Sequence, residues 1–235
     1  MQTPVKKLNV SRAERARVTR NRMLTCAGAL FLSQGYAATT VEQIAIDAGV
    51  AVQTVYYTFR TKGLLLRELV EMTAAGGEQA APVMERAWAR DMLSVTSAQR
   101  VLALAVEHGT AIYERVAMLW PAVAAAAAAD SDVATYWSSV NAARRDGQRR
   151  MVARIVELDA LRPDLDPEQA TDLVVMFLGH AVYRNLVIEA GWPVATFRAW
   201  LFSTIVPQLL GPVEFDLHAT EDLSFGGHQA GIERT

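Results

Sequence analysis

Residues 39–59 read TTVEQIAIDAGVAVQTVYYTF, and the fold of the chain follows from this stretch. Thr40 followed by Gln43 is the pattern of a capping box, in which the two side chains cap the first turn of a helix. That short helix is expected to end at Gly49, and a second short helix is predicted over residues 52–58. Two short helices joined by a tight turn form a helix-turn-helix.

The rest of the chain also follows a helical period. Apolar residues between Arg17 and Gln34 recur on one stripe, and Gly35 stands where a glycine closes a helix. Glycine and proline mark the ends of the other segments, and the alternating runs of β-branched residues that predict strands are not found. The sequence therefore predicts an all-α protein, with further helices over residues 62–75, 82–92, 98–118, 123–129, 131–159, 167–190 and 193–210.

The composition is that of a globular protein with a core. Of 235 residues, 51% are hydrophobic, 20% charged and 8% aromatic, and this length corresponds to one or two domains. The single cysteine, Cys26, offers neither an intramolecular disulfide nor a cysteine-rich metal site. We expect a basic arm over residues 1–17, a helix-turn-helix domain over 18–61, a larger helical domain over 62–211 that begins with a linking helix, and a loose tail over 212–235.

The net charge of -2 conceals an uneven distribution. Residues 1–60 carry eight basic and three acidic side chains, whereas residues 61–235 carry 15 basic and 22 acidic ones. A small basic module attached to an acidic body is typical of a protein in which one part contacts a polyanion. A basic arm that is merely solvated gives the same count, so the charge by itself leaves both explanations open.

The helices predicted over residues 167–190 and 193–210 are more apolar than one buried face requires. A helix that is apolar all round is buried on all sides, in its own core or in that of a partner. We therefore expect a homodimer in which two helices from each subunit build a four-helix bundle. The longest uncharged apolar stretch, residues 173–183, spans only about 16 Å as a helix, so no membrane partner is expected. Basic residues interrupt the first thirty positions and exclude a signal peptide, which predicts a cytoplasmic protein.

Residues 22–66 resemble the DNA-binding module of the TetR family of bacterial transcriptional regulators. The resemblance rests on residues at fixed offsets: Met23-Leu24, Cys26-Ala27, Leu30-Phe31, Gly35-Tyr36, Thr39-Thr40-Val41, Ile44-Ala45, Ala48-Gly49-Val50, Thr54-Val55-Tyr56, Phe59, Lys62 and Leu65. The chain departs from the family pattern at Ala51, where serine is usual, and at Gly63, where an acidic residue is usual. The resemblance implies an N-terminal three-helix DNA-binding domain, joined by a linking helix to a larger helical domain for ligand binding and dimerisation.

The second helix of the motif carries side chains suited to base edges. Gln53 can bind adenine through two hydrogen bonds, Val52 can contact a thymine methyl group, and Tyr57 can do either. Four further positions resemble those at which the family contacts phosphates: Thr40, Thr54, Tyr56 and Lys62. Packing and capping are the alternative roles of Thr54 and Tyr56. The predicted partner is double-stranded operator DNA, with added minor-groove or phosphate contacts from the basic arm.

The resemblance further implies that the larger domain binds a small effector that relieves repression. The sequence itself supports only an apolar, aromatic-rich interior that suits a small apolar or aromatic molecule. The candidate pocket residues are Trp88, His108, Tyr113, Trp137, Met176, Phe177 and His180. Side chains of these types are more often core than ligand contacts, and the two histidines need hydrogen-bond partners in either role.

Known catalytic patterns are missing from the sequence, which has no Gly-x-Ser-x-Gly, no Cys-x-x-Cys, no His-Glu-x-x-His and no phosphate-binding glycine loop. We therefore predict no enzyme activity, no catalytic residue, no metal and no cofactor. Three functions stay open. The protein is a repressor released from a palindromic operator by an effector, a DNA-binding regulator whose larger domain only dimerises or docks a protein, or a helical small-molecule-binding protein or enzyme that has lost DNA binding.

Overall fold

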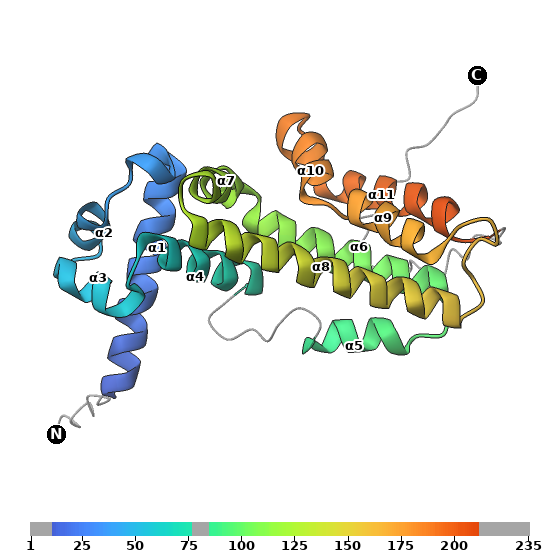
Figure 1. Ribbon diagram of the computed structural model, residues 1–235, viewed down its shortest axis with the longest axis horizontal. Helices are drawn as coiled ribbons and strands as arrows, with labels where there is room; N and C mark the ends of the chain where they lie inside the picture. The colour runs from blue at the N-terminus through green and yellow to red at the C-terminus, as the bar shows by residue number, and fades with distance from the viewer. Residues whose placement is uncertain (1–10, 77–84, 212–235) are drawn as a thin grey trace, which may run out of the picture. The chain divides into compact units, whose positions relative to one another are not determined.

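The computed structural model describes residues 11–76 and 85–211, and the regular elements there are helices (Figure 1). Apart from them, this part of the chain contains one isolated antiparallel bridge between Leu161 and Leu210. The prediction of an all-α protein with an N-terminal helix-turn-helix followed by a larger helical region is confirmed. The tail predicted over residues 212–235, most of the basic arm and the beginning of the helix predicted over 82–92 lie outside the described residues.

The N-terminal region contains α1 (Arg12–Ala38), α2 (Val41–Asp47), α3 (Val52–Phe59) and α4 (Lys62–Ala75). Helix α1 extends beyond its predicted bounds of residues 17–34 at both ends. It begins earlier because the side chain of Ser11 accepts a hydrogen bond from the main-chain N–H of Glu14 at 3.1 Å and caps the first turn. Gly35 interrupts the helix where the sequence predicted its end, with a φ of 83° in the left-handed region favoured by glycine, and a short further helical segment continues from this kink to Ala38.

The middle of the chain forms α5 (Ala87–Ser94), α6 (Ala98–Val116), the 3-10 turn η2 (Ala117–Leu119), α7 (Trp120–Ala129) and α8 (Ser131–Glu157). The alanine run over residues 123–129 is helical, as predicted from the helix propensity of alanine. Asp130 separates α7 from α8 and caps α8. Its Oδ1 atom accepts hydrogen bonds from the main-chain N–H groups of Asp132 at 2.9 Å and Val133 at 3.3 Å.

The C-terminal region consists of α9 (Pro167–Phe177), α10 (His180–Tyr183), the π-helix η3 (Arg184–Glu189) and α11 (Val194–Leu209). The single helix predicted over residues 167–190 is therefore wrong, because the chain breaks at Leu178 and Gly179. A Cβ atom at Gly179 would lie 2.9 Å from the main-chain oxygens of both Val175 and Met176. Only glycine fits this break without moving the backbone, which marks it as a built feature of the fold.

The helices divide into two compact units. The first unit consists of Met1–Glu71 and Met118–Trp137, and α7 packs against α1 within it. The second unit consists of Met72–Ala117 and Ser138–Thr235. The helix-turn-helix thus shares a unit with residues 118–137, which the sequence analysis placed in the larger domain.

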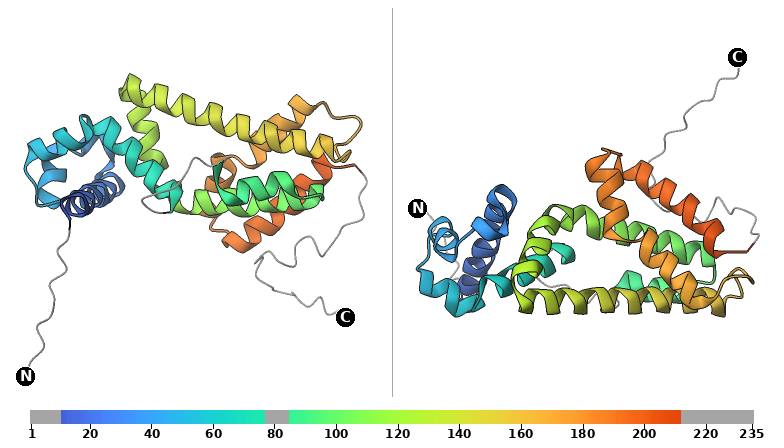
Figure 2. Two further views of the ribbon diagram at one scale, coloured as in Figure 1. Left: turned by 90° about the horizontal axis from the view of Figure 1, so that it is seen from below. Right: turned by 45° about the horizontal axis from the view of Figure 1, so that its top comes forward.

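Each unit has its own apolar core. In the first unit, buried side chains of the first four helices form the core around the helix-turn-helix, among them Met23, Leu24, Phe31, Ile44, Val55, Phe59, Leu65 and Leu66. In the second unit α11 lies along α6 and also packs against α9 (Figures 1 and 2). The buried side chains at its centre include Leu102, Val106, Met151, Ile155, Val174, Phe197, Leu201, Ile205 and Leu209.

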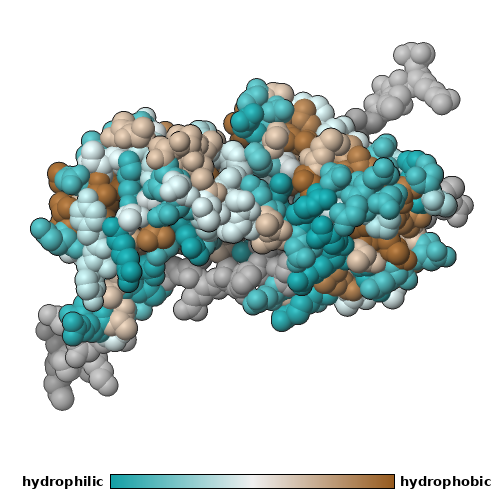
Figure 3. Space-filling model, in the orientation of Figure 1, coloured by the Kyte–Doolittle hydropathy of each residue, from teal (hydrophilic) through white to brown (hydrophobic). Residues whose placement is uncertain are grey.

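Apolar surface is spread over several places. The face drawn in Figure 3 carries separate hydrophobic patches among hydrophilic residues rather than one continuous belt. Within the described residues, one segment, Pro167–Glu189, has the length and hydropathy of a membrane-spanning helix. Length and composition alone are weak grounds for a membrane span, and this segment breaks at Gly179.

Candidate DNA-binding surface and ligand cleft

The capping box predicted at the beginning of α2 is present. The main-chain N–H of Gln43 donates to Thr40 Oγ1 at 3.2 Å, and the main-chain N–H of Thr40 donates to Gln43 Oε1 at 2.8 Å. These two hydrogen bonds satisfy main-chain donors that a helix N-terminus otherwise leaves open. The Thr40 hydroxyl accepts in this box, and its own proton stays available to donate to a phosphate oxygen.

Helix α3 presents one face to the core and another to solvent. Val55 and Phe59 are each 2% exposed and pack inward, one helical turn apart. Gln53 and Tyr57 are also one turn apart but point outward, and Tyr57 is 91% exposed. A large aromatic side chain so exposed on a short helix is available to a partner. Of the other predicted contact residues, Tyr56 is exposed, whereas Val52 and Thr54 are half-buried.

The first turn of α3 has weaker capping than that of α2. Ala51 occupies the N-cap position and has no side-chain acceptor for the main-chain donors behind it. The serine usual in the family would provide that acceptor, a difference worth about 1 kcal/mol. The N-terminal end of α3, which carries Val52 and Gln53, is therefore held by packing rather than by a cap.

Lys62 begins α4 and ties it to the end of α1. Its Nζ atom donates hydrogen bonds to the main-chain oxygens of Tyr36 and Thr39, each at 2.8 Å, and lies 4.2 Å from the centre of the Tyr36 ring. Burial lowers the pKa of Lys62. An ammonium group has three N–H donors, so one donor remains for another acceptor. The phosphate contact predicted for Lys62 stays a prediction, and the structure adds a bracing role.

Several cations of the first unit are available to an anion. Arg17 pairs with Glu14 at 2.6 Å, and Arg20 pairs with Glu68. By contrast, Arg15, Arg22 and Arg60 are exposed, and no carboxylate within the described ranges forms an ion pair with them. Exposed, uncompensated guanidinium groups are suited to phosphate oxygens.

Gly63 departs from the family pattern for a steric reason. A Cβ atom at this position would lie 2.8 Å from Val133 Cγ2 and 2.9 Å from Asp130 Oδ2. An acidic side chain would collide with this segment and would also face the Asp130 carboxylate. The contact brings the beginning of α4 against the junction of α7 and α8 inside the first unit.

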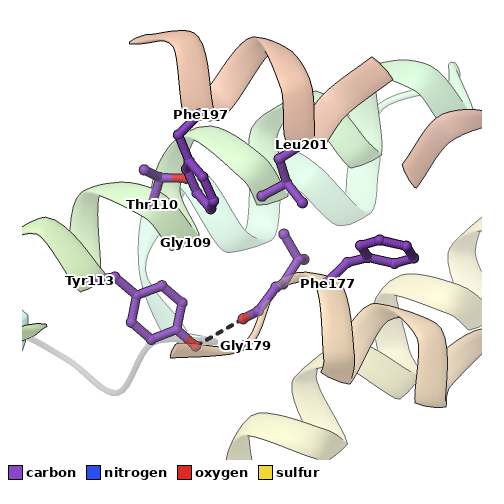
Figure 4. Close-up of a pocket in the computed structure, with 8 residues that line it drawn as sticks. Gly109, Thr110, Tyr113, Phe177, Gly179, Phe197 and Leu201 are labelled. Carbon is purple, nitrogen blue, oxygen red and sulfur yellow. Dashed lines mark hydrogen bonds between the residues drawn. The ribbon is translucent and has the colours of Figure 1, made fainter. Parts of the chain in front are cut away.

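The second unit contains a small cleft between α6, the α9–α10 break and α11 (Figure 4). Its empty space, including the part open to solvent, is about 180 Å³. The lining residues are Gly109, Thr110, Tyr113, Phe177, Leu178, Gly179, Phe197 and Leu201. Two of the predicted pocket residues, Tyr113 and Phe177, belong to this lining. The hydroxyl of Tyr113 donates to the main-chain oxygen of Leu178 at 2.9 Å, so it satisfies a group exposed by the helix break.

The other predicted pocket residues do not line this cleft. Trp88 stacks on His108 with ring centres 4.6 Å apart, and Met176 is 52% exposed. Burial is the main cause that lowers the pKa of both His108 and His180. Trp137 belongs to the other compact unit, where its ring meets that of Trp120 edge-on at 4.3 Å.

Sequence reasoning missed most of the lining of this cleft. Thr110, Leu178, Gly179, Phe197 and Leu201 come together only because the segment 167–190 breaks, and an unbroken helix offers no such recess. Gly179 was the one available signal, since a glycine inside an apolar helical run can mark a break. Within residues 11–76 and 85–211, no three His, Cys, Asp or Glu side chains are arranged to hold a metal ion.

Comparisons with known proteins agree with this fold. Residues 24–69 match the family model described as bacterial regulatory proteins, tetR family. No curated protein matches the chain. Among solved structures, NalD from Pseudomonas aeruginosa, the secondary repressor of the MexAB-OprM multidrug efflux pump, superposes with a TM-score of 0.65 at 19% identity, covering 84% of this chain and 100% of NalD.

Two further solved structures are similar. The regulator FadR from Bacillus subtilis, in complex with stearoyl-CoA, gives a TM-score of 0.62 at 15% identity over 80% of this chain and 97% of that one. A TetR transcription regulator from Haloarcula marismortui gives 0.61 at 14% identity over 83% and 100%. At these identities the structures show the fold alone. The family match covers residues 24–69 alone, so it is this N-terminal module that is similar to the bacterial regulatory proteins of the tetR family.

Proposed function

We propose that the protein is a sequence-specific DNA-binding repressor that a small-molecule effector releases from a palindromic operator. The observation that carries the proposal is α3, which buries Val55 and Phe59 and presents Gln53 and Tyr57 to solvent. A short helix anchored on one face and exposed on the other can enter the major groove. A regulator of bacterial promoters acts in the cytoplasm.

In this proposal the exposed face of α3 reads base edges. Gln53 pairs with an adenine, while Val52 and Tyr57 contact neighbouring bases or a thymine methyl group. Four other residues hold the sugar-phosphate backbone and set the register: Thr40, Thr54, Tyr56 and Lys62. The uncompensated Arg15, Arg22 and Arg60 add sequence-independent attraction.

A homodimer supplies the two copies of α3 that a palindrome requires. The apolar surface that supports this interface lies on residues 167–190 and 193–210, where Met176 is 52% and Ile188 44% exposed. Burying such side chains against their copies in a second subunit is favourable by about 25 cal/mol for each Å² of apolar area removed from water. In the dimer the two recognition helices meet successive major grooves about 34 Å apart.

An effector that binds in the second unit would weaken operator binding. The Bacillus subtilis FadR structure contains stearoyl-CoA, which supports ligand binding by a protein of this fold. Coupling of this kind typically amounts to about 1–3 kcal/mol and is reciprocal, so operator DNA weakens effector binding by the same factor.

A regulator without an effector is the second candidate, and the size of the cleft favours it. The empty space of about 180 Å³ includes the part open to solvent, so the enclosed part is well below the range of about 300–1,000 Å³ usual for ligand pockets. A ligand-dependent loss of operator binding separates the two candidates. If a ligand binds tightly and the operator affinity stays unchanged, effector release is refuted and the second candidate stands.

The DNA-binding proposal is tested by fluorescence anisotropy of the purified protein on DNA from upstream of its own gene, with a shuffled duplex as control. We expect tight binding to the native fragment alone and a steep fall of log K with log salt. If the protein binds both duplexes equally and weakly, the titration is repeated with genomic fragments selected for binding. Equal, weak binding to those fragments as well would refute sequence-specific recognition. That outcome would favour a small-molecule-binding protein or enzyme that has lost DNA binding.

A further inference from the structure

Helix α8 carries five arginines that differ in whether they form an ion pair, and the proposed function does not explain this difference. Four of them are paired with carboxylates: Arg145 with Glu168 and Asp172, Arg149 with Glu168, Arg150 with Asp146 and Arg154 with Glu157. The fifth, Arg144, is half-buried, and no carboxylate in the described part of the chain forms an ion pair with it. A guanidinium taken partly out of water without a counter-ion is costly.

Arg144 is connected to the lining of the cleft through Tyr113. Its Nη1 atom donates to the Tyr113 hydroxyl at 3.1 Å, and Tyr113 lines the cleft. Its Nε atom is buried and finds no hydrogen-bond partner among residues 11–76 and 85–211. One charge and one unused donor are thus held beside an apolar recess.

Two neighbouring polar side chains are also unsatisfied. Thr110, one turn before Tyr113, is 2% exposed, lines the cleft, and its Oγ1 atom has no partner among the described groups. Gln148, one turn after Arg144, is 9% exposed, and its Oε1 atom is likewise unpartnered there. Buried polar atoms without partners are rare in folded proteins, and each one calls for a cause such as a ligand.

Helices α6 and α8 run antiparallel. Arg144 is linked to Tyr113, while Arg154 donates to the main-chain oxygen of Val95, just before α6, at 3.0 Å. Moving forward along α8 therefore means moving backward along α6, from the level of Tyr113 toward that of Val95. Figure 4 shows Thr110 and Tyr113 on α6 opposite Phe177, with Phe197 and Leu201 of α11 closing the apolar side.

We infer that this cleft binds a short apolar monocarboxylic acid, with its carboxylate held by Arg144 and its apolar body against Phe177, Phe197 and Leu201. The inference rests on the proposed function in that it names the chemical class of the effector. Arginine binds carboxylates through strong, charge-assisted hydrogen bonds, and the Thr110 hydroxyl supplies a further donor. The Gln148 amide can turn its N–H₂ group toward the same anion. The empty space of about 180 Å³ includes the part open to solvent, so it is an upper limit and restricts the ligand to a short chain or a single ring.

The local field agrees with an anionic ligand. Burial is the largest cause that lowers the pKa of His180, and the positive charges of Arg144 and Arg184 lower it further. A carboxylate bound beside Arg144 offsets this positive field rather than adding to it.

The test compares benzoate, phenylacetate and hexanoate with the neutral amides of the same shape, by isothermal titration calorimetry on the full-length protein. We expect the acids to bind at least about tenfold more tightly than the amides, as for a charge-assisted carboxylate site. Arg144→Gln should remove this preference. The matched control Arg149→Gln, which alters an exposed and already paired arginine of the same helix, should retain it.

A second variant distinguishes a ligand site from a structural polar network. In Thr110→Val a methyl group replaces the unpartnered hydroxyl, so the ligand-free protein should melt at a higher temperature while acid binding weakens several-fold. A lower melting temperature would mean that Thr110 is satisfied inside the protein, by a resident water for example, and would overturn the assignment. So would equal binding of acids and amides, or no binding of any acid at millimolar concentration.

The operator titration is run on the same preparations to separate the two proposals. Retained sequence-specific DNA binding together with failed acid binding overturns only the assignment of the ligand class. Acid binding with the expected Arg144 dependence and no specific DNA binding overturns the proposed function instead.

Discussion

Lys62→Met tests how the helix-turn-helix is held together and whether Lys62 also contacts DNA. The substitution keeps an unbranched apolar stem and removes the ammonium group that donates to the main-chain oxygens of Tyr36 and Thr39 at 2.8 Å. A hydrogen bond from a charged donor contributes about 1.5–3 kcal/mol. Lys62 is half-buried, and the released carbonyl groups can be hydrated in part, so we expect a net loss of about 2–3 kcal/mol in the free energy of unfolding.

The loss is measured by urea unfolding of the full-length protein, followed by far-ultraviolet circular dichroism. The control is Arg150→Met, which removes an exposed ion pair with Asp146 at 3.0 Å and should cost less than about 0.5 kcal/mol. DNA binding should weaken equally on all sequences. The slope of log K against log salt should fall by about one unit for each phosphate contact removed.

Two separate results would refute this reasoning. A free energy of unfolding within about 0.5 kcal/mol of the wild type would mean that the bridge from α4 to the end of α1 does not stabilise the protein. An unchanged salt slope would mean that the third N–H of Lys62 does not reach a phosphate, leaving Lys62 as a brace alone.

Three further predictions concern stability. Gly63→Ala should destabilise the protein by about 1–2 kcal/mol, because the new methyl group collides with Val133. Gly28→Ala, where a Cβ meets only Leu69 at 3.5 Å, should stabilise it by up to about 1 kcal/mol. A stabilising Gly63→Ala or a destabilising Gly28→Ala in urea unfolding would contradict this packing. Thr40→Val should cost about 1 kcal/mol through the lost capping box, and an unchanged midpoint would refute it. Burial lowers the pKa of His180 below its ordinary value of 6.5, so the unfolded state takes up the proton first as the pH falls. The free energy of unfolding should therefore decrease below about pH 6.5, and His180→Gln should show a shallower decrease. A steeper decrease in the variant would contradict the lowered pKa.

The helix-turn-helix could be predicted from sequence because its signals are local. The capping box of Thr40 and Gln43 and the glycine at position 49, with its φ of 61°, lie within a dozen residues of one another. The buried face of α3 also depends on short-range spacing, since Val55 and Phe59 are one turn apart. Local chemistry and tertiary structure agree there, as expected of a foldable sequence.

The remainder depends on contacts between distant residues. The break at Leu178 and Gly179 is stabilised by the hydroxyl of Tyr113, which donates to the main-chain oxygen of Leu178, 65 positions away, so helical periodicity alone predicted an unbroken helix. The bracing role of Lys62 arises from carbonyl groups on another helix. Trp137 was grouped with the pocket because of its residue type, whereas its compact unit is set by the packing of α7 against α1.

The central claim is that α3 reads a palindromic sequence through Gln53. The most direct test is selection of binding sites from randomised duplexes, carried out in parallel with the wild type and with Gln53→Ala. The account predicts that the wild type enriches one palindrome, and that the variant enriches the same palindrome with sequence preference lost at one symmetric pair of positions, each worth about 1–3 kcal/mol. Recovery of no common sequence by the wild type, or of an identical sequence by the variant, would contradict it.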